Sequence, residues 1–134
     1  MQATDLAPDD HAVLAEARRV ADTLYLEGVH TVASAVRTRS GAMFAGINIA
    51  TRMPFADVCG EVAALSAMVA ASQREPALIV AVRGDGRGTH EIVPPCGRCR
   101  ELISDFDLGT WVIVGTLEQP RKLPVASLLP LKAW

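Results

Sequence analysis

The spacing of apolar residues predicts three helices. Apolar positions recur every three or four residues after Asp9 and Asp10, either of which could cap a helix that Gly28 is placed to end. The run EVAALSAMVAAS that follows Gly60 is rich in helix formers and stops before Pro76. A third helix is expected from about Gly97 to Phe106, and residues 124–134 (PVASLLPLKAW) favour a further short helix.

Four segments have the apolar pattern of strands. Residues 30–38 and 43–49 flank the turn at residues 39–41, which favours a hairpin. Residues 77–82 and 111–114 are continuously apolar, as is typical of strands buried on both faces of an α/β sheet. The sequence therefore predicts one α/β domain over residues 1–134, with a central mixed sheet of about five strands packed between helices. We expect residues 1–8 to be a flexible tail and residues 50–58 an irregular loop.

Composition and charge narrow the function. Half of the 134 residues are hydrophobic, as in a globular protein. The formal net charge of −2 predicts that neither nucleic acid nor an anionic membrane is a partner. No apolar run approaches the about 18 residues of a membrane span, and the first residues do not resemble a signal peptide. Three cysteines, an odd number, favour a reducing cytoplasmic location over a disulfide framework.

Two short motifs carry the candidate chemistry. Cys59 precedes one predicted helix, and Cys96 and Cys99 form a C-x-x-C pair at the start of another. A helix N-terminus favours the thiolate, and three thiolates leave one position open on a tetrahedral zinc ion, as in catalytic sites. Zinc lowers the pKa of its bound water to about 7, and Glu61 could accept that proton and return it to a leaving amine.

Each motif has an alternative interpretation. The C-x-x-C pair alone could be a redox pair or half of a structural zinc site, and His90 could be a fourth ligand. The rival function is a non-catalytic protein in which zinc staples two helices beside a ligand-binding pocket. The combination C-x-E … P-C-x-x-C favours catalysis.

The same residues resemble the zinc deaminases. The chain is similar to the small cytidine deaminases and the blasticidin-S deaminases, in PPCGRCRELISDF, in VASAV at 32–36 and in LLP at 128–130. The resemblance implies a hydrolase of nucleoside metabolism that converts the 4-amino group of a cytosine-type nucleoside to a 4-oxo group and releases ammonia. It also implies a zinc cofactor and a homotetramer.

The resemblance assigns roles by position. Cys59, Cys96 and Cys99 would bind zinc, and Glu61 would move protons. The Gly60 N–H would meet the pyrimidine O2, the Pro94 carbonyl would meet the departing amino group, and Asn48 would contact the sugar.

Departures from the family pattern leave the substrate open. Ala50 stands where cytidine deaminases have a glutamate for the ribose, and His30 stands where relatives stack an aromatic ring on the pyrimidine. Discrimination for ordinary cytidine should therefore fall, and a modified cytosine such as blasticidin S is an alternative substrate. Arg98 and Arg100 could donate hydrogen bonds to the zinc-binding sulfurs. Trp134 is expected to help close the protein's own pocket or a neighbour's.

Overall fold

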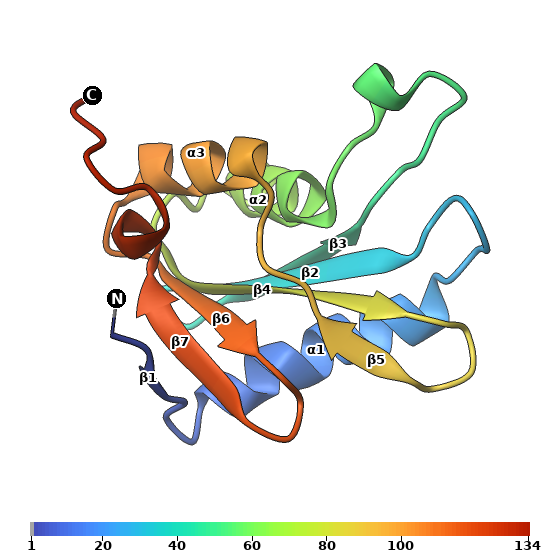
Figure 1. Ribbon diagram of the computed structural model, residues 1–134, viewed down its shortest axis with the longest axis horizontal. Coiled ribbons are helices and arrows are strands. Elements are labelled where there is room, and N and C mark those ends of the chain that lie inside the picture. The colour runs from blue at the N-terminus through green and yellow to red at the C-terminus, as the bar shows by residue number, and fades with distance from the viewer. Residues whose placement is uncertain (1) are drawn as a thin grey trace.

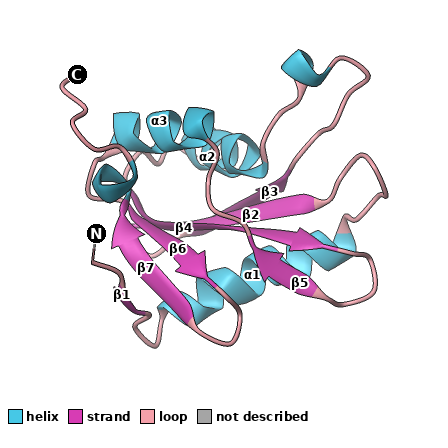
Figure 2. Cartoon of the chain, viewed as in Figure 1, coloured by secondary structure: helices cyan, strands magenta, loops and turns pink. Residues whose placement is uncertain are grey.

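A mixed β-sheet forms the middle layer of the protein, with one helix on one face and two on the other (Figure 1). The computed structural model describes residues 2–134. The helices are α1 (Asp10–Thr23), α2 (Gly60–Ala70) and α3 (Gly97–Phe106). The strands are β1 (Thr4–Asp5), β2 (Val32–Thr38), β3 (Met43–Ile47), β4 (Pro76–Gly84), β5 (His90–Ile92), β6 (Trp111–Gly115) and β7 (Pro120–Pro124). Short 3₁₀ helices cover Pro54–Ala56 and Val125–Leu128 (Figure 2).

The strand order is β1-β7-β6-β4-β2-β3, and β5 pairs with the far end of β4. All pairs are antiparallel except β4 with β6. A parallel pair needs a connection that crosses a face of the sheet, and α3 lies within that connection. This crossover brings α3 onto the same face as α2 (Figure 1).

Alternation along β4 divides the core between the two faces. Leu78, Val80 and Val82 are buried in the cluster that packs against α1. Ile79 belongs to the opposite cluster, which contains Leu65 of α2 and Ile103 of α3. A strand covered on both sides must be apolar at every position, which explains its uninterrupted hydrophobic sequence.

The predicted α/β architecture and the three helices are confirmed, with differences at the edges. Within residues 2–134 the sheet has seven strands and not about five, because three short strands are set by pairing partners and not by their own composition. One of them lies within the expected tail over residues 1–8, of which residue 1 is outside the described residues: Thr4 and Asp5 pair with Lys122 and Arg121 of β7. The first helix ends at Thr23, well before Gly28.

The first helix also begins differently from the expectation. Neither the Asp9 nor the Asp10 side chain accepts a capping hydrogen bond from an N–H group in the first turn of the helix. The Asp10 carboxylate instead accepts hydrogen bonds from the Ala7 N–H at 2.8 Å, Arg37 at 2.9 Å and Lys122 at 2.7 Å. This buried carboxylate joins the start of α1 to β2 and β7.

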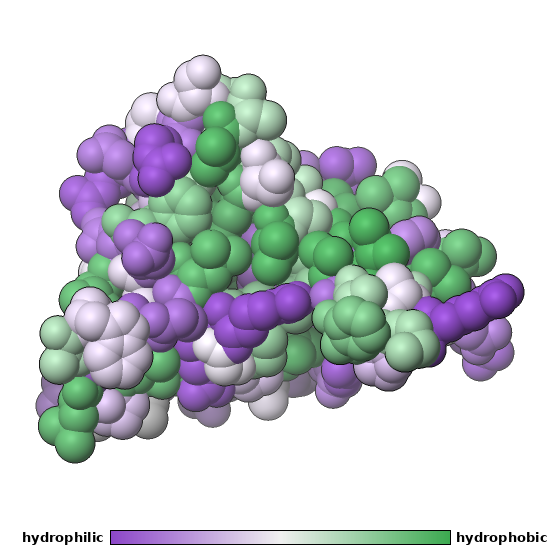
Figure 3. Space-filling model, turned by 90° about the horizontal axis from the view of Figure 1, so that it is seen from above, coloured by the Kyte–Doolittle hydropathy of each residue, from purple (hydrophilic) through white to green (hydrophobic). Residues whose placement is uncertain are grey.

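Apolar side chains remain uncovered on the face that carries α2 and α3. Figure 3 shows hydrophobic residues gathered in a band across this side of the molecule. A groove between the two helices is lined by Val62, Leu65, Ser66, Val69, Leu102 and Phe106. None of the helices in residues 2–134 has the length and apolar character needed to cross a membrane.

Candidate metal centre

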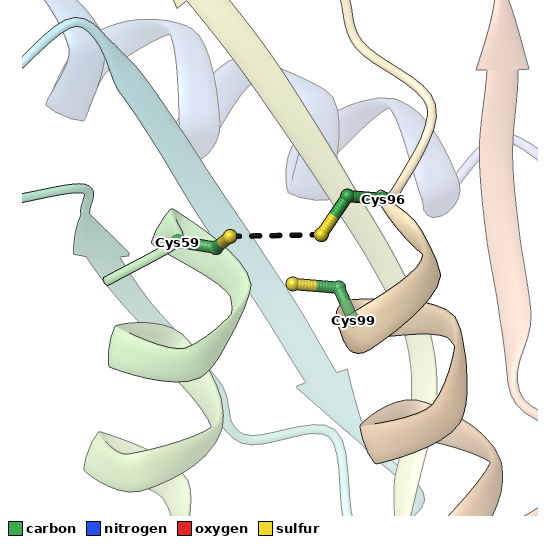
Figure 4. A group of neighbouring side chains, drawn as sticks. All are labelled: Cys59, Cys96 and Cys99. Carbon is green, nitrogen blue, oxygen red and sulfur yellow. Dashed lines mark hydrogen bonds between the residues drawn. The ribbon is translucent and has the colours of Figure 1, made fainter. Parts of the chain in front are cut away.

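Three cysteine side chains meet where α2 and α3 begin. Cys59 is the residue before α2, Cys96 is the residue before α3, and Cys99 lies in the first turn of α3. Their sulfur atoms point toward one another (Figure 4) and all lie within 4.8 Å of one another. The Cys59 and Cys96 sulfurs are 3.7 Å apart. Two sulfurs bound tetrahedrally to one zinc ion at about 2.3 Å would be about 3.8 Å apart, so the observed spacing fits zinc.

Glycine allows α2 to start against the sheet. A Cβ atom on Gly60 would lie 2.7 Å from the Val32 carbonyl oxygen. A second close approach occurs one turn later, where a Cβ on Gly46 of β3 would lie 2.5 Å from the Ala63 Cβ. Because neither position carries a side chain, the N-terminus of α2, and with it Cys59, can lie close to β2 and β3.

The electrostatics of the cluster favour a bound cation. Burial, the Glu61 carboxylate and the other two cysteines together raise the pKa of the Cys99 thiol. Burial also acts to raise the pKa of Cys96, but hydrogen bonds from the Cys99 and Arg98 N–H groups and the neighbouring thiols lower it overall. Three thiols and a carboxylate packed together repel one another once ionised, and a divalent cation removes that cost.

Glu61 lies at the base of the same site. Its side chain is buried, and this burial raises its pKa, although hydrogen bonds to its own backbone and to the Cys99 thiol lower it in part. A carboxyl group whose pKa is raised is better suited to accept a proton and return it. Glu61 follows Cys59 by two residues, which places it in the first turn of α2 beside the sulfurs.

The two arginines of α3 have different roles. Arg98 Nη2 lies 3.5 Å from the Cys59 sulfur and donates a 3.0 Å hydrogen bond to the Asp57 carbonyl. Arg100 does not contact a sulfur: its Nε donates to the Pro95 carbonyl at 2.7 Å. Each helical residue turns by about 100°, so Arg100 faces back over the start of α3 and not across to α2. The expected arginine–sulfur contact is therefore made by Arg98.

A pocket of about 210 Å³ opens beside the sulfurs. Six of its lining residues were predicted from the sequence for metal binding, catalysis or substrate contacts: Asn48, Cys59, Gly60, Glu61, Pro94 and Cys96. The remaining lining residues are Val32, Asp57, Val58 and Val93, none of which was singled out from the sequence. Asp57 could have been noticed as an acidic residue two positions before Cys59, a predicted metal ligand.

Asn48 and His30 are joined to each other at the edge of this pocket. The Asn48 side-chain oxygen accepts hydrogen bonds from the Thr31 and Val32 N–H groups at 2.7 and 3.0 Å. His30 Nδ1 lies 2.7 Å from the Asn48 carbonyl oxygen, so this nitrogen carries a proton and donates it. His30 is not among the residues that line the pocket. Its expected stacking on a substrate ring stays a prediction.

Trp134 lies away from the pocket of its own chain. Its indole Nε1 donates a hydrogen bond to Glu101 Oε1 of α3 at 2.8 Å. The same oxygen accepts a hydrogen bond from Lys132 Nζ at 2.9 Å. The indole remains 82% exposed. Trp134 was expected to close either the pocket of its own chain or that of a neighbour. In this conformation it does not close its own.

Comparison with known proteins agrees with this geometry. The chain is 29% identical to a blasticidin-S deaminase of Bacillus cereus, over 98% of this chain and 97% of that protein. A cytidine deaminase structure from Burkholderia pseudomallei is 28% identical, covering 92% of this chain and 98% of that one, with a TM-score of 0.75. A cytidine deaminase structure from Mycobacterium leprae shares the fold at 22% identity, covering 92% and 99% of the two chains, with a TM-score of 0.76. No family model matches the chain.

Proposed function

Because the chain is a full-length homologue of the cytidine deaminases and blasticidin-S deaminases, we propose that it is a zinc-dependent hydrolytic deaminase of cytosine-type nucleosides. The reaction would replace the 4-amino group of the ring by a 4-oxo group and release ammonia. The observation that carries the proposal is the convergence of three cysteine sulfurs within 4.8 Å, next to a pocket that also contains buried Glu61.

The residues of this centre divide the work between metal binding and proton transfer. Cys59, Cys96 and Cys99 would hold zinc, which when bound supplies a Lewis acid that lowers the pKa of a water molecule. In the net reaction a C–O bond forms at C4 and the C4–N bond breaks. The water gives up both of its protons: Glu61 takes them in turn and delivers one to ring N3 and one to the departing nitrogen, so one carboxyl group serves both steps.

The pocket wall would hold the ring and its substituent. Asn48 has its side-chain oxygen occupied by two backbone N–H groups, so its NH₂ group is the part left to donate to a sugar hydroxyl. The Gly60 N–H belongs to the unpaired first turn of α2 and suits an acceptor such as the pyrimidine O2. The Pro94 carbonyl suits the amino group that leaves. The substrate is cytidine, deoxycytidine or an analogue such as blasticidin S.

The assembly we propose is a homotetramer. Its support is the apolar groove between α2 and α3, in which Val69 is 40% exposed. A second copy packed against this groove would remove that surface from water. The three free thiols must stay reduced to bind metal, which favours the cytoplasm as the compartment.

The test compares the wild-type protein with Glu61→Gln. Both proteins are loaded with zinc, their metal content is measured, and ammonia release is followed with cytidine, deoxycytidine and blasticidin S. We expect Glu61→Gln to keep its zinc and to lose at least about 100-fold in turnover, because proton transfer contributes about that much or more. Glu118→Gln, at an exposed position outside the pocket, is the control and should retain activity.

The rival function makes the opposite prediction. A non-catalytic protein stapled by zinc would bind one zinc ion per chain and release no ammonia from any compound of the panel. That result would overturn the deaminase proposal.

A further inference from the structure

One carboxylate in the wall of the pocket has no part in the proposed chemistry. Asp57 lines the pocket together with Asn48 and Glu61, and it comes from the loop that precedes α2. Glu61 is buried at the base, whereas Asp57 is partly exposed. Asp57 therefore lies on the side of the pocket that faces solvent, where a ring substituent would lie. The inference below rests on the proposed deaminase function and concerns the same pocket.

Asp57 is held in place from two sides. Its Oδ1 accepts hydrogen bonds from the Thr51 N–H at 2.7 Å and from the Thr51 hydroxyl at 2.8 Å. Its backbone carbonyl accepts the 3.0 Å hydrogen bond from Arg98. Within residues 2–134, no hydrogen bond is made to Asp57 Oδ2. One carboxylate oxygen thus positions the side chain, and the other is left for a ligand.

The backbone pairing places Asp57 opposite Ala50. Ile49 and Val58 exchange both of their backbone hydrogen bonds, at 2.9 and 3.0 Å, as an antiparallel pair does. One position further along, Ala50 and Asp57 face each other, and side chains of facing residues lie on the same side. Ala50 carries only a methyl group and is not among the lining residues, whereas Asp57 lines the pocket and carries a carboxylate.

The charge around Asp57 favours donors over anions. No lysine or arginine is among the described residues that line the pocket, and its two carboxylates belong to Asp57 and Glu61. Arg98, which contacts the Asp57 backbone, is already bound to the Asp57 carbonyl and the Cys59 sulfur. A phosphate placed here would meet negative charge without a cation to pair with, whereas a hydroxyl, ammonium or guanidinium group could donate to Oδ2.

We infer that Asp57 is a specificity-determining residue, whose free oxygen accepts a hydrogen bond from a donor group on the substituent of the pyrimidine ring. The pocket would then take cytosine compounds whose substituent is neutral or cationic and carries donors, and would reject the corresponding nucleotides. The shared chemistry is the donor group; a sugar hydroxyl and a cationic amine or guanidine are its two sources.

Asp57→Asn tests this with little change of shape. The Asn oxygen still accepts both Thr51 hydrogen bonds, but the free oxygen becomes an NH₂ group, which donates and carries no charge. Dissociation constants for cytidine, cytidine 5′-monophosphate and blasticidin S are measured by calorimetry, with zinc-loaded Glu61→Gln as the background so that nothing is turned over. Values of kcat/KM are measured with Glu61 intact.

The decisive quantity is the ratio of the nucleotide and nucleoside dissociation constants, because effects on the ring and the zinc centre cancel in it. A high ratio means that the nucleoside is preferred. We expect Asp57→Asn to lower the ratio by about 10- to 100-fold, the effect of one charged hydrogen bond. A loss of affinity mainly for cytidine identifies a hydroxyl as the donor, and a larger loss for blasticidin S identifies a cation. A ratio that changes by less than twofold overturns the inference.

Two controls separate recognition from general damage. Asp105→Asn removes the same charge from an exposed position on α3 and should leave the ratio unchanged. Thr51→Val loosens the loop and keeps the Asp57 charge; if it shifts the ratio as much as Asp57→Asn, Asp57 acts only through loop position and the inference is wrong. Binding of the panel without ammonia release by the wild-type protein would overturn the proposed function alone. A failure to bind any of the three compounds would overturn both.

Discussion

Gly46→Ala should damage the metal centre without a change at any ligand. Gly46 lies in β3, and a Cβ there would be 2.5 Å from the Ala63 Cβ and 2.8 Å from backbone atoms of Ala63 and Ala64. Carbon atoms in ordinary contact are about 3.5–4.0 Å apart, so α2 must move away from the sheet by about 1 Å. No rotamer change relieves the clash, because two of the three contacts are with backbone.

The expected effects follow from what α2 carries. Overpacking of this size costs about 1–3 kcal/mol of unfolding free energy, so the domain should still fold. Cys59 and Glu61 move with α2, whereas Cys96 and Cys99 stay on α3. Metal–ligand distances tolerate only about 0.2 Å, and we therefore expect zinc affinity to fall about 10-fold or more.

The assay is a competition for zinc between the protein and a chromophoric chelator, with urea unfolding of the metal-free protein alongside it. Gly97→Ala is the matched control, because a Cβ at Gly97 in α3 meets no atom within 4 Å. Equal zinc affinities for the two variants, within twofold, would refute the argument that the close approach of β3 and α2 sets the geometry of the centre.

Two further predictions concern stability and assembly. Asp10→Asn should lower the unfolding free energy by about 3 kcal/mol at pH 7, because Arg37 and Lys122 lose a buried partner. Burial acts to raise the pKa of Asp10, but its hydrogen bonds lower it overall, below its usual value of 3.8. The stabilisation is therefore complete above about pH 4 and lost at lower pH, and urea titrations in which the variant's deficit stayed constant down to pH 2 would contradict this. Val69→Lys should dissociate the proposed tetramer in light scattering, whereas Leu108→Lys, at a similarly exposed site outside the groove, should not; a wild-type protein that is already dissociated would contradict the proposed assembly.

The elements that were predicted correctly from the sequence are those that depend on neighbouring residues. The third helix follows the expected range from Gly97 to Phe106, and the apolar run at 77–82 forms the core of β4. Both depend on local composition and on burial of the whole segment, and the pattern of apolar residues along the sequence indicates both. β1, β5 and β7 were missed because such short strands are stabilised by their pairing partners, and a partner such as Lys122 for Thr4 lies far away in the sequence.

The amino-acid sequence by itself determined which groups the candidate centre contains: three cysteine sulfurs, a nearby carboxylate, and their places at the starts of two helices. Only the tertiary structure decided which of the neighbouring groups take part. Arg98 reaches a sulfur while Arg100 turns back to Pro95, and Asp57 enters the pocket opposite Ala50 while His30 does not line it. Which side chains take part depends on how two helices and a loop are placed over one sheet. The local sequence does not determine the distances between these elements.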